Sequence, residues 1–234
     1  MPDSHVALIH IDFSENYLCG YASEIQSVHF GASHQQATLH TGMLYVKDHK
    51  VPFCTISPSR RHDPPAIWAH MEPVFSLLKE LDPYVSQLHF FSDGPTTQYR
   101  QKANFYFLGT IPFSKGYTSA SWNFFEASHG KGAPDGVGGS IKRLADNMKR
   151  RGKDIPDASS LYNSLIQQES AVKLYFIDPI IIDNYDKKLP LQIPVIKVIF
   201  RLLTGSDIKN YKLDTIQFTI FILEDPLIVY GQYC

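Results

Sequence analysis

The sequence predicts an α/β protein in which helices flank a mixed β-sheet. Short runs rich in apolar and β-branched residues have the length of buried strands, and stretches with helical spacing of apolar residues separate the later runs. Strands that alternate with helices after an opening series of strands form a mixed sheet covered by helices. A chain of 234 residues, of which 44% are hydrophobic, is long enough to bury a core of this kind.

The opening strands are expected to form an antiparallel meander. VALIHID at 6–12 is an apolar run that closes on an acid, and the run at 36–46 alternates as a half-buried strand does. KDHK predicts a hairpin turn from this run to a strand at 51–57. A further strand is expected in SVHFGA, residues 27–32.

Helices and strands alternate in the rest of the chain. A helix over 64–81 is predicted by apolar residues at helical spacing after Asp63 and two prolines, with Trp68, Met71 and Leu78 in the core. The other expected elements are strands at 87–93, 119–127 and 172–178 and helices at 97–108, 134–153 and 157–170. We divide the chain into a catalytic-core domain at 1–178 and a C-terminal extension at 179–234. The tail from 197 carries apolar runs but no site-like polar residues, so a truncation near 196 is expected to leave a folded core.

Composition and cysteine usage exclude several classes of protein. The chain carries 22 Lys plus Arg against 23 Asp plus Glu, so a surface that binds polyanions everywhere is not expected, whereas a local basic patch is. Three scattered cysteines predict neither a disulfide framework nor a zinc knuckle; Cys54 is expected to be a core thiol and His62 and His70 solvated imidazoles. No signal peptide or membrane span is visible, so we expect a protein of the nucleus or cytoplasm with no membrane partner.

Acidic residues follow two of the expected strands. Asp12 closes the first strand and Asp93 the strand at 87–93, while Glu126, His129 and Asp135 lie in a polar segment after the next strand. Three such acids suit hard cations such as Mg²⁺ or Mn²⁺, and a pair of these ions activates water in phosphodiester cleavage. Each acid taken alone is equally typical of a turn, since both Asp93 and Asp135 precede glycine. His129 is expected either to contact a phosphate or shuttle a proton, or simply to be solvated.

The segments DFSENY (12–17), FSDGPTTQYR (91–100) and NFFEASHGKGAPDGVGG (123–139) resemble the catalytic core of transposases of eukaryotic DNA transposons. The resemblance covers about residues 6–152 and implies the ribonuclease H-like fold of the DDE/DDD superfamily. In that pattern one Asp lies on the first strand, one follows the fourth, and an acid lies on the helix after the fifth. These positions fall on Asp12, Asp93 and Asp135, with Glu126 as the rival for the third. Asp135 is preferred because it opens a helix, whose N-terminus stabilises a carboxylate.

The sequence also departs from that of a complete transposase. The first strand begins five residues after Met1, which leaves no room for the N-terminal DNA-binding module of such enzymes. A fragmentary or domesticated element is therefore expected.

A basic run follows the third acid. Six cations against Asp146 give residues 142–153 a net charge of +5, and they are expected to hold DNA phosphates unless they form an ordinary solvated helix face. These cations are Lys142, Arg143, Lys149, Arg150, Arg151 and Lys153, and Gln98, Tyr99, Arg100 and Lys102 are expected to extend the same track.

The sequence thus predicts a metal-dependent polynucleotidyl transferase, or nuclease, that cleaves and transfers DNA strands with two Mg²⁺ or Mn²⁺ ions. The alternative is a catalytically inactive transposon-derived module that binds DNA or protein. Either protein could act as a homo-oligomer.

Overall fold

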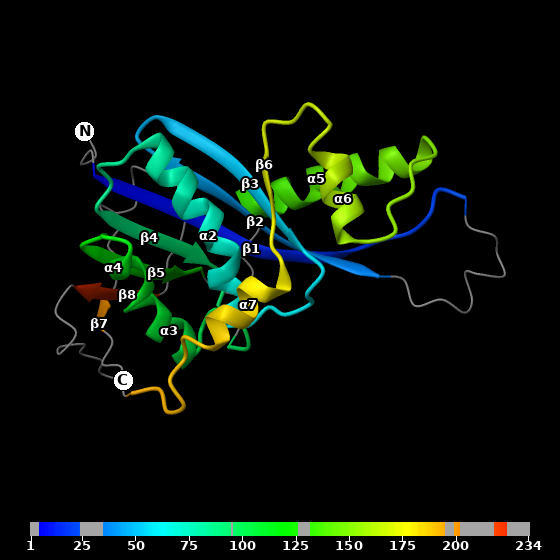
Figure 1. Cartoon of the computed structure of the whole chain (residues 1–234). Coiled ribbons are helices and arrows are strands. Elements are labelled where there is room, and N and C mark those ends of the chain that lie inside the picture. The colour runs from blue at the N-terminus through cyan, green and yellow to red at the C-terminus, as the bar shows by residue number, and fades with distance from the viewer. Residues whose placement is uncertain are drawn as a thin grey trace.

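An eight-stranded mixed sheet forms the centre of the protein, with the strand order β6-β3-β2-β1-β4-β5-β8-β7 (Figure 1). The computed structural model describes residues 5–23, 35–94, 96–125, 132–194, 199–201 and 218–223. β1 pairs in parallel with β4 and antiparallel with β2, so the sheet is mixed as the sequence predicts. The strands are β1 Val6–Leu18, β2 Gln36–Val46, β3 His49–Ser57, β4 Gln87–Ser92, β5 Ser119–Phe124, β6 Lys173–Phe176, β7 Ile199–Arg201 and β8 Phe218–Leu223.

Helices cover the two faces of this sheet, so the predicted α/β arrangement is confirmed. They are α2 Pro64–Leu81, α3 Lys102–Leu108, α4 Ile111–Ser114, α5 Ala133–Arg150, α6 Ala158–Leu165 and α7 Pro179–Asp186. One buried cluster joins the sheet to α2, α3, α4 and α7, and a second joins it to α5 and α6. Figure 1 shows α5 and α6 grouped together, apart from α2, α3 and α7. None of the helices described is long and apolar enough to cross a membrane.

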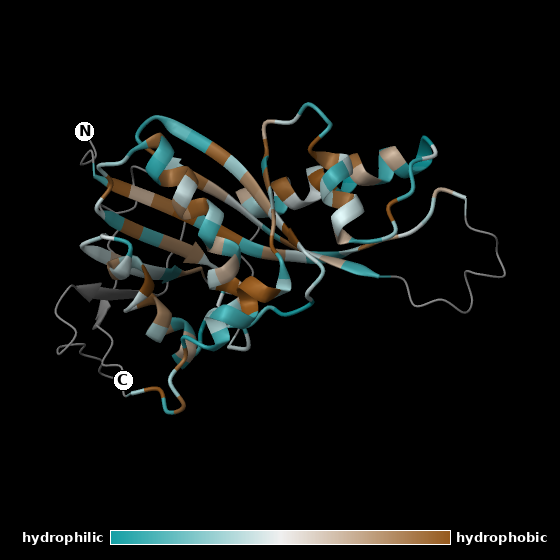
Figure 2. Cartoon of the chain, in the orientation of Figure 1, coloured by the Kyte–Doolittle hydropathy of each residue, from teal (hydrophilic) through white to brown (hydrophobic). Residues whose placement is uncertain are grey.

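Alternation along each strand separates the two clusters. Ile9 and Ile11 face α2, whereas His10 and Asp12 point to the face that carries α5, because successive side chains of a strand point to opposite sides. Figure 2 shows hydrophobic and more polar residues interspersed along the strands. Trp68, Met71 and Leu78 are fully buried, as the helical spacing predicts.

Most predicted elements are confirmed, with some shifted ends. The helix at 64–81 and the strand at 36–46 match their expected bounds. β1 runs six residues past Asp12 because it keeps pairing with β2 through a register shift between Ser14 and Tyr17. The helix expected from 97 begins only at Lys102, after a series of turns. The strand expected at 27–32 lies outside the described residues.

The end of the chain differs from the expected separable tail. β8 pairs antiparallel with β5, and β7 with β8, so both strands extend the sheet. α7 contributes Ile182 and Tyr185 to the core beside α2. A truncation near 196 would therefore unpair the edge of β5, and an independent core without the tail is no longer expected. The domain boundary at 178 stays a prediction.

Two glycines let α5 lie close on β1. A Cβ built on Gly132 would lie 2.5 Å from the ring of His10, and one on Gly138 would lie 2.5 Å from Ser14 Oγ and 3.0 Å from Ser14 Cβ. Real Cβ atoms do not approach other atoms so closely, so any larger residue would push α5 off the sheet. Gly136, on the same helix, faces open space.

This packing predicts opposite effects for two glycine-to-alanine variants of α5. Gly136→Ala should raise the free energy of unfolding by about 1 kcal/mol, since alanine favours a helix interior. Gly138→Ala should lower it by roughly 1–2 kcal/mol, because overpacking against Ser14 outweighs the same helical gain. Urea denaturation of both variants measures the difference, and Ser14→Gly should restore the stability of Gly138→Ala. Equal stabilisation by both alanines would show that α5 does not sit on β1 at this distance.

Candidate active site

Strand register brings Asp12 and Asp93 side by side. His10 on β1 pairs with Phe91 on β4, so two residues further along each chain lie Asp12 and Asp93. The two strands are parallel neighbours, and both acids have the parity that faces α5 rather than α2. Both are half-buried. The pairing therefore sets two carboxylates side by side at the end of β4, the position outside the strand ends where α/β sheets bind ligands, which is called the crevice below.

The start of α5 brings Asp135 to the same crevice. Gly132, the N-cap, contacts His10 on one side of Asp12, and Gly138 contacts Ser14 on the other. Asp135 lies between these two glycines in the first turn of α5. Its side chain is exposed, and its Oδ2 accepts a hydrogen bond from the Gly132 backbone N–H at 2.9 Å. The helix N-terminus stabilises this negative charge close to the other two.

Burial and neighbouring negative charge disfavour the ionisation of Asp12 and Asp93. Burial, followed by the charges of Asp93 and Asp135, raises the pKa of Asp12 to about 7, against the partial relief of a hydrogen bond from the Phe13 N–H. Burial and the charge of Asp135 also raise the pKa of Asp93. Asp93 Oδ1 is buried and has no hydrogen-bond partner in the described part of the chain. A carboxylate cluster of this kind is stabilised by a proton or by a bound cation.

His10 belongs to this crevice although the sequence did not single it out. Its side chain is 5% exposed, and its ring lies 4.9 Å from that of Phe125, centroid to centroid, and against Gly132. Burial lowers the pKa of His10 to about 4 despite the nearby charge of Asp135, so the imidazole is neutral at pH 7. The signal available in the sequence is its spacing: residues two apart on a strand share a face, and His10 precedes Asp12 by two.

The residues after Asp93 that are expected to contact DNA differ in what they contact within the protein. The Arg100 guanidinium lies beside Gly94 and 5.0 Å above the centre of the Phe124 ring, next to the acids. Lys102 Nζ donates a hydrogen bond to the Ile193 carbonyl at 2.6 Å. The prediction that Tyr99 contacts DNA is wrong. Its side chain is fully buried in the core that α2 covers, and its hydroxyl forms a hydrogen bond of 3.2 Å with His40 Nε2.

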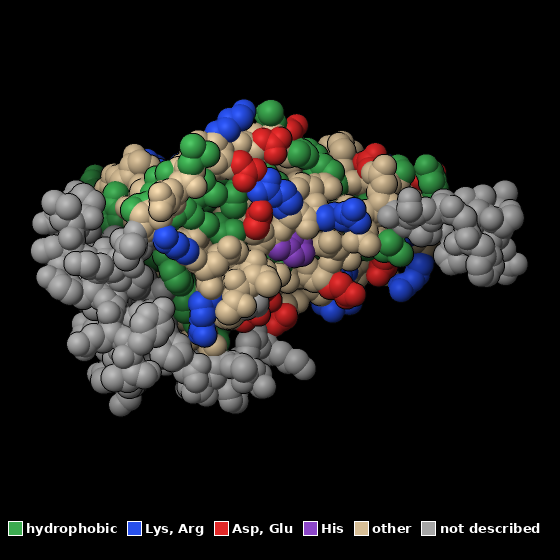
Figure 3. Space-filling view, turned by 90° about the horizontal axis from the view of Figure 1, so that it is seen from below, with side chains coloured by type: hydrophobic (Ala, Val, Ile, Leu, Met, Phe, Trp, Pro, Cys, Tyr) green, Lys and Arg blue, Asp and Glu red, His purple; other side chains and the backbone are tan. Residues whose placement is uncertain are grey.

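The cations of the basic run are mostly engaged within the protein. Lys142 lies 3.8 Å from Glu15, and Lys149 the same distance from Asp146. Arg143 donates to Ser140 Oγ at 3.1 Å, and Arg150 to Asn147 Oδ1 at 2.8 Å. Basic and acidic side chains are likewise interspersed on the face seen in Figure 3, with no broad area of one sign.

The histidines beyond the crevice differ in part from expectation. His70 is fully buried and its Nδ1 lies 2.7 Å from Thr55 Oγ1, so its expected solvation is wrong. His62 is half-buried and stacks on the ring of Phe13 at 4.2 Å. Cys54 is a buried thiol, as predicted. His70 lies on the face of α2 that packs against the sheet, which accounts for its burial.

The donor set at the crevice suits a hard cation, although it is not preassembled. Among the residues that the structure describes, no three His, Cys, Asp or Glu side chains already surround one point as metal ligands. Glu126 and His129 lie outside those residues, so the preference for Asp135 over Glu126 stays a prediction. Carboxylate oxygens are the ligands that Mg²⁺ and Mn²⁺ prefer, and Asp93 Oδ1 lacks any other partner there.

The chain belongs to the family described as Domain of unknown function (DUF8701), whose model matches residues 2–217. The match includes the crevice, both helical layers and β7. Neither a curated protein nor a solved structure matches the chain.

The raised pKa of Asp12 predicts a variant that is more stable than the natural chain at high pH. Because the pKa of Asp12 is higher in the folded protein than its ordinary value of 3.8, its ionisation destabilises the fold as the pH rises from about 4 through about 7. Asp12→Asn removes this cost and should add roughly 1–3 kcal/mol to the free energy of unfolding at pH 8 in the absence of divalent cations.

The matched control is Asp48→Asn, which removes an exposed carboxylate from the β2–β3 turn. Denaturation at pH 4 and pH 8 measures both variants. The gain from Asp12→Asn should nearly vanish at pH 4. A gain that is the same at both pH values, or that Asp48→Asn reproduces, would contradict the raised pKa of Asp12.

Proposed function

We propose that this chain is a ribonuclease H-like polynucleotidyl transferase core of the transposase type, which cleaves and joins DNA strands with Mg²⁺ or Mn²⁺. The observation that carries the proposal is the strand register that sets Asp12 beside Asp93, with Asp135 near enough that its charge adds to burial in raising the pKa of both. Asp12 lies on the first strand, Asp93 directly after the fourth, and Asp135 on the helix after the fifth. The same three positions carry the acids of the DDE/DDD superfamily that the sequence resembles.

Each acid has a distinct part in holding the cations. Asp12 lies on β1 and Asp93 directly follows β4, its parallel neighbour, so the strand pairing positions the backbone of both acids before any ion arrives. Asp135 caps α5 with Oδ2, which leaves Oδ1 to complete the ligand set. When bound, a pair of divalent ions would activate the attacking water or 3′-hydroxyl and stabilise the leaving oxygen. The neutral ring of His10, on the same face of β1 as Asp12, packs against the side chain of Phe125 and adds a buried apolar wall beside the acids.

DNA would approach this crevice along α5. Since the formal net charge is −1, attraction of a polyanion must come from local groups rather than from the whole surface. Arg100 lies beside the acids, and the exposed cations of α5 lead away from them. Residence in the nucleus follows from this function and is part of the same proposal.

One observation favours the alternative, an inactive module that binds DNA or protein. The Asp135 carboxylate is engaged in capping its own helix, and the three acids do not form a ready ligand group in the portion described. A chain that had lost catalysis would retain Asp135 as a cap and the cations of α5 as a contact surface. Such a module would bind DNA with or without divalent ions.

Mn²⁺ binding separates the two functions. Isothermal titration of Mn²⁺ into the full chain at pH 8 should show uptake by the natural protein. Asp12→Ala should weaken it roughly tenfold, equivalent to about 1.4 kcal/mol, while the matched Asp48→Asn should leave it unchanged. The affinity should fall as the pH drops below about 7, because the proton then competes for Asp12. No uptake, or equal uptake by Asp12→Ala, would exclude the enzyme and leave the binding module.

A further inference from the structure

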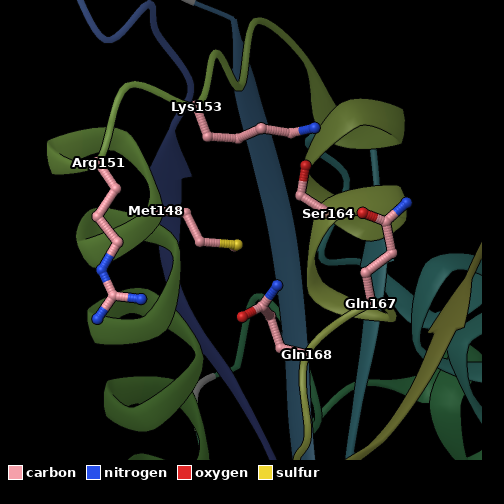
Figure 4. Close-up of a pocket in the computed structure, with 6 residues that line it drawn as sticks. All are labelled: Met148, Arg151, Lys153, Ser164, Gln167 and Gln168. Atoms are coloured by element: carbon pink, nitrogen blue, oxygen red, sulfur yellow. The ribbon is translucent and has the colours of Figure 1, made fainter.

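A hollow of about 180 Å³ opens between the end of α5 and α6 (Figure 4). The rise of an α-helix places it about 20 Å along α5 from Asp135, so it is separate from the candidate active site. Its walls combine two cations, a serine and two primary amides over a methionine, without a carboxylate among them. The lining residues are Met148, Arg151, Lys153, Ser164, Gln167 and Gln168.

The backbone fixes the two cations at the mouth of this hollow. Gly152 has a φ of +91°, the left-handed conformation that ends helices. The Lys153 N–H bonds the Met148 carbonyl at 3.0 Å, and the Gly152 N–H bonds the Lys149 carbonyl at 2.9 Å. This pair of hydrogen bonds folds the chain back over Met148, so Lys153 begins beside the floor of the hollow. Figure 4 shows its side chain reaching across toward Ser164.

Arg151 and Lys153 differ from the other cations of the basic run in having no partner among the residues that the structure describes. Lys142, Arg143, Lys149 and Arg150 each contact an acid, hydroxyl or amide of the protein. The side chains of Arg151 and Lys153 form no hydrogen bond or ion pair within the described ranges. Both are exposed. Positive charge that the protein itself does not neutralise is therefore concentrated at the hollow, where an anion would be stabilised.

The floor and far wall suit a flat, polar-edged ring. Met148 is 7% exposed and points into the space between the helices, where its thioether can pack on an aromatic face. The Gln167 and Gln168 amides carry paired donors and acceptors of the kind that recognise nucleobase edges. Ser164 adds a hydroxyl from a residue that is 4% exposed. A phosphate alone would use the cations but not the amides or the sulfur.

We propose that this hollow binds one unstacked nucleotide of a single DNA strand. Arg151 and Lys153, whose side chains point away from each other in Figure 4, hold the two phosphates that flank this nucleotide. Met148 packs on its base, and Gln167 and Gln168 hydrogen-bond the edge of the base. The inference rests on the DNA-binding part of the proposed function and requires no metal ion. At 3.4 Å per base pair, the 20 Å between the hollow and Asp135 corresponds to about six base-pair steps of adjoining duplex. Recognition of an unpaired nucleotide would thus set where the duplex meets the acids.

Fluorescence anisotropy with the full chain tests the site. The probes are a labelled 12-nucleotide single strand, the same strand with several abasic positions, and its duplex, each titrated without divalent ions. Gln167→Ala/Gln168→Ala should weaken binding of the intact single strand about fivefold to tenfold and leave the abasic strand and the duplex unchanged. Arg151→Ala/Lys153→Ala should weaken all three probes and lower the salt dependence by about 1.4 in the logarithmic slope for single strands.

Lys187→Ala/Lys188→Ala is the matched control, because it removes two exposed charges at the end of α7 on the opposite layer. A glutamine variant that affects no probe, or affects the abasic strand equally, overturns the nucleotide site. Equal losses of affinity in Arg151→Ala/Lys153→Ala and in Lys187→Ala/Lys188→Ala overturn it as well, since charge alone would then account for binding. Single-strand binding that survives when Mn²⁺ uptake fails would reject only the catalytic proposal, whereas Mn²⁺ uptake with no glutamine effect would reject only the hollow.

Discussion

The parallel pairing of β1 with β4 is the contact on which the rest of the site depends. It places Asp12 beside Asp93, because His10 and Phe91 are paired and each acid lies two residues after its paired residue. A slip of one residue would send one of the acids to the face of α2, among buried aromatic side chains, and a slip of two would move the acids apart along the strands. The pairing is specified by the hydrophobic alternation, since Ile9 and Phe90 must both face the core that α2 covers. Core packing and site geometry are therefore set by one set of backbone hydrogen bonds.

The third acid depends on how closely a helix can approach this sheet. α5 reaches β1 through two glycines that occupy the space where side chains would stand, at His10 and at Ser14. This approach brings Asp135 near enough to raise the pKa of Asp12 and of Asp93. The fold thus tolerates a cluster of like charges, which is the usual circumstance in which a protein binds a cation or carries out chemistry. Other ionisable groups whose pKa is strongly shifted, such as His40 and His70, lie in the packed core instead.

Local sequence patterns predicted the helices and strands well and the contacts between them poorly. The helix at 64–81 matches because two prolines and a regular apolar stripe fix its start and face. β1 is longer than expected: Ser14, Glu15 and Asn16 look like loop residues, yet β1 resumes its pairing with β2 at Tyr17, after the register shift. Tyr99 was expected on the surface since it follows a strand end among polar residues, but the chain folds back and buries it against His40. Such outcomes depend on tertiary contacts that no local pattern contains.

The candidate site shows the same division. The sequence indicated which acids follow strands. Only the register and the glycine contacts show that Asp12, Asp93 and Asp135 lie near one another. His10 escaped notice because a single histidine on a strand has no motif. The basic run was recognised by its sign, but the sequence does not reveal that four of its cations have partners while Arg151 and Lys153 line a hollow.

The measurement that tests the central claim most directly is anomalous X-ray diffraction from crystals of the full chain soaked in Mn²⁺ at pH 8. Our account predicts an anomalous peak in the crevice at the end of β4, within about 2.0–2.6 Å of oxygens of Asp12 and Asp93, with Asp135 turned toward it. Peaks confined to surface carboxylates, with Asp12 and Asp93 facing apart, would contradict it.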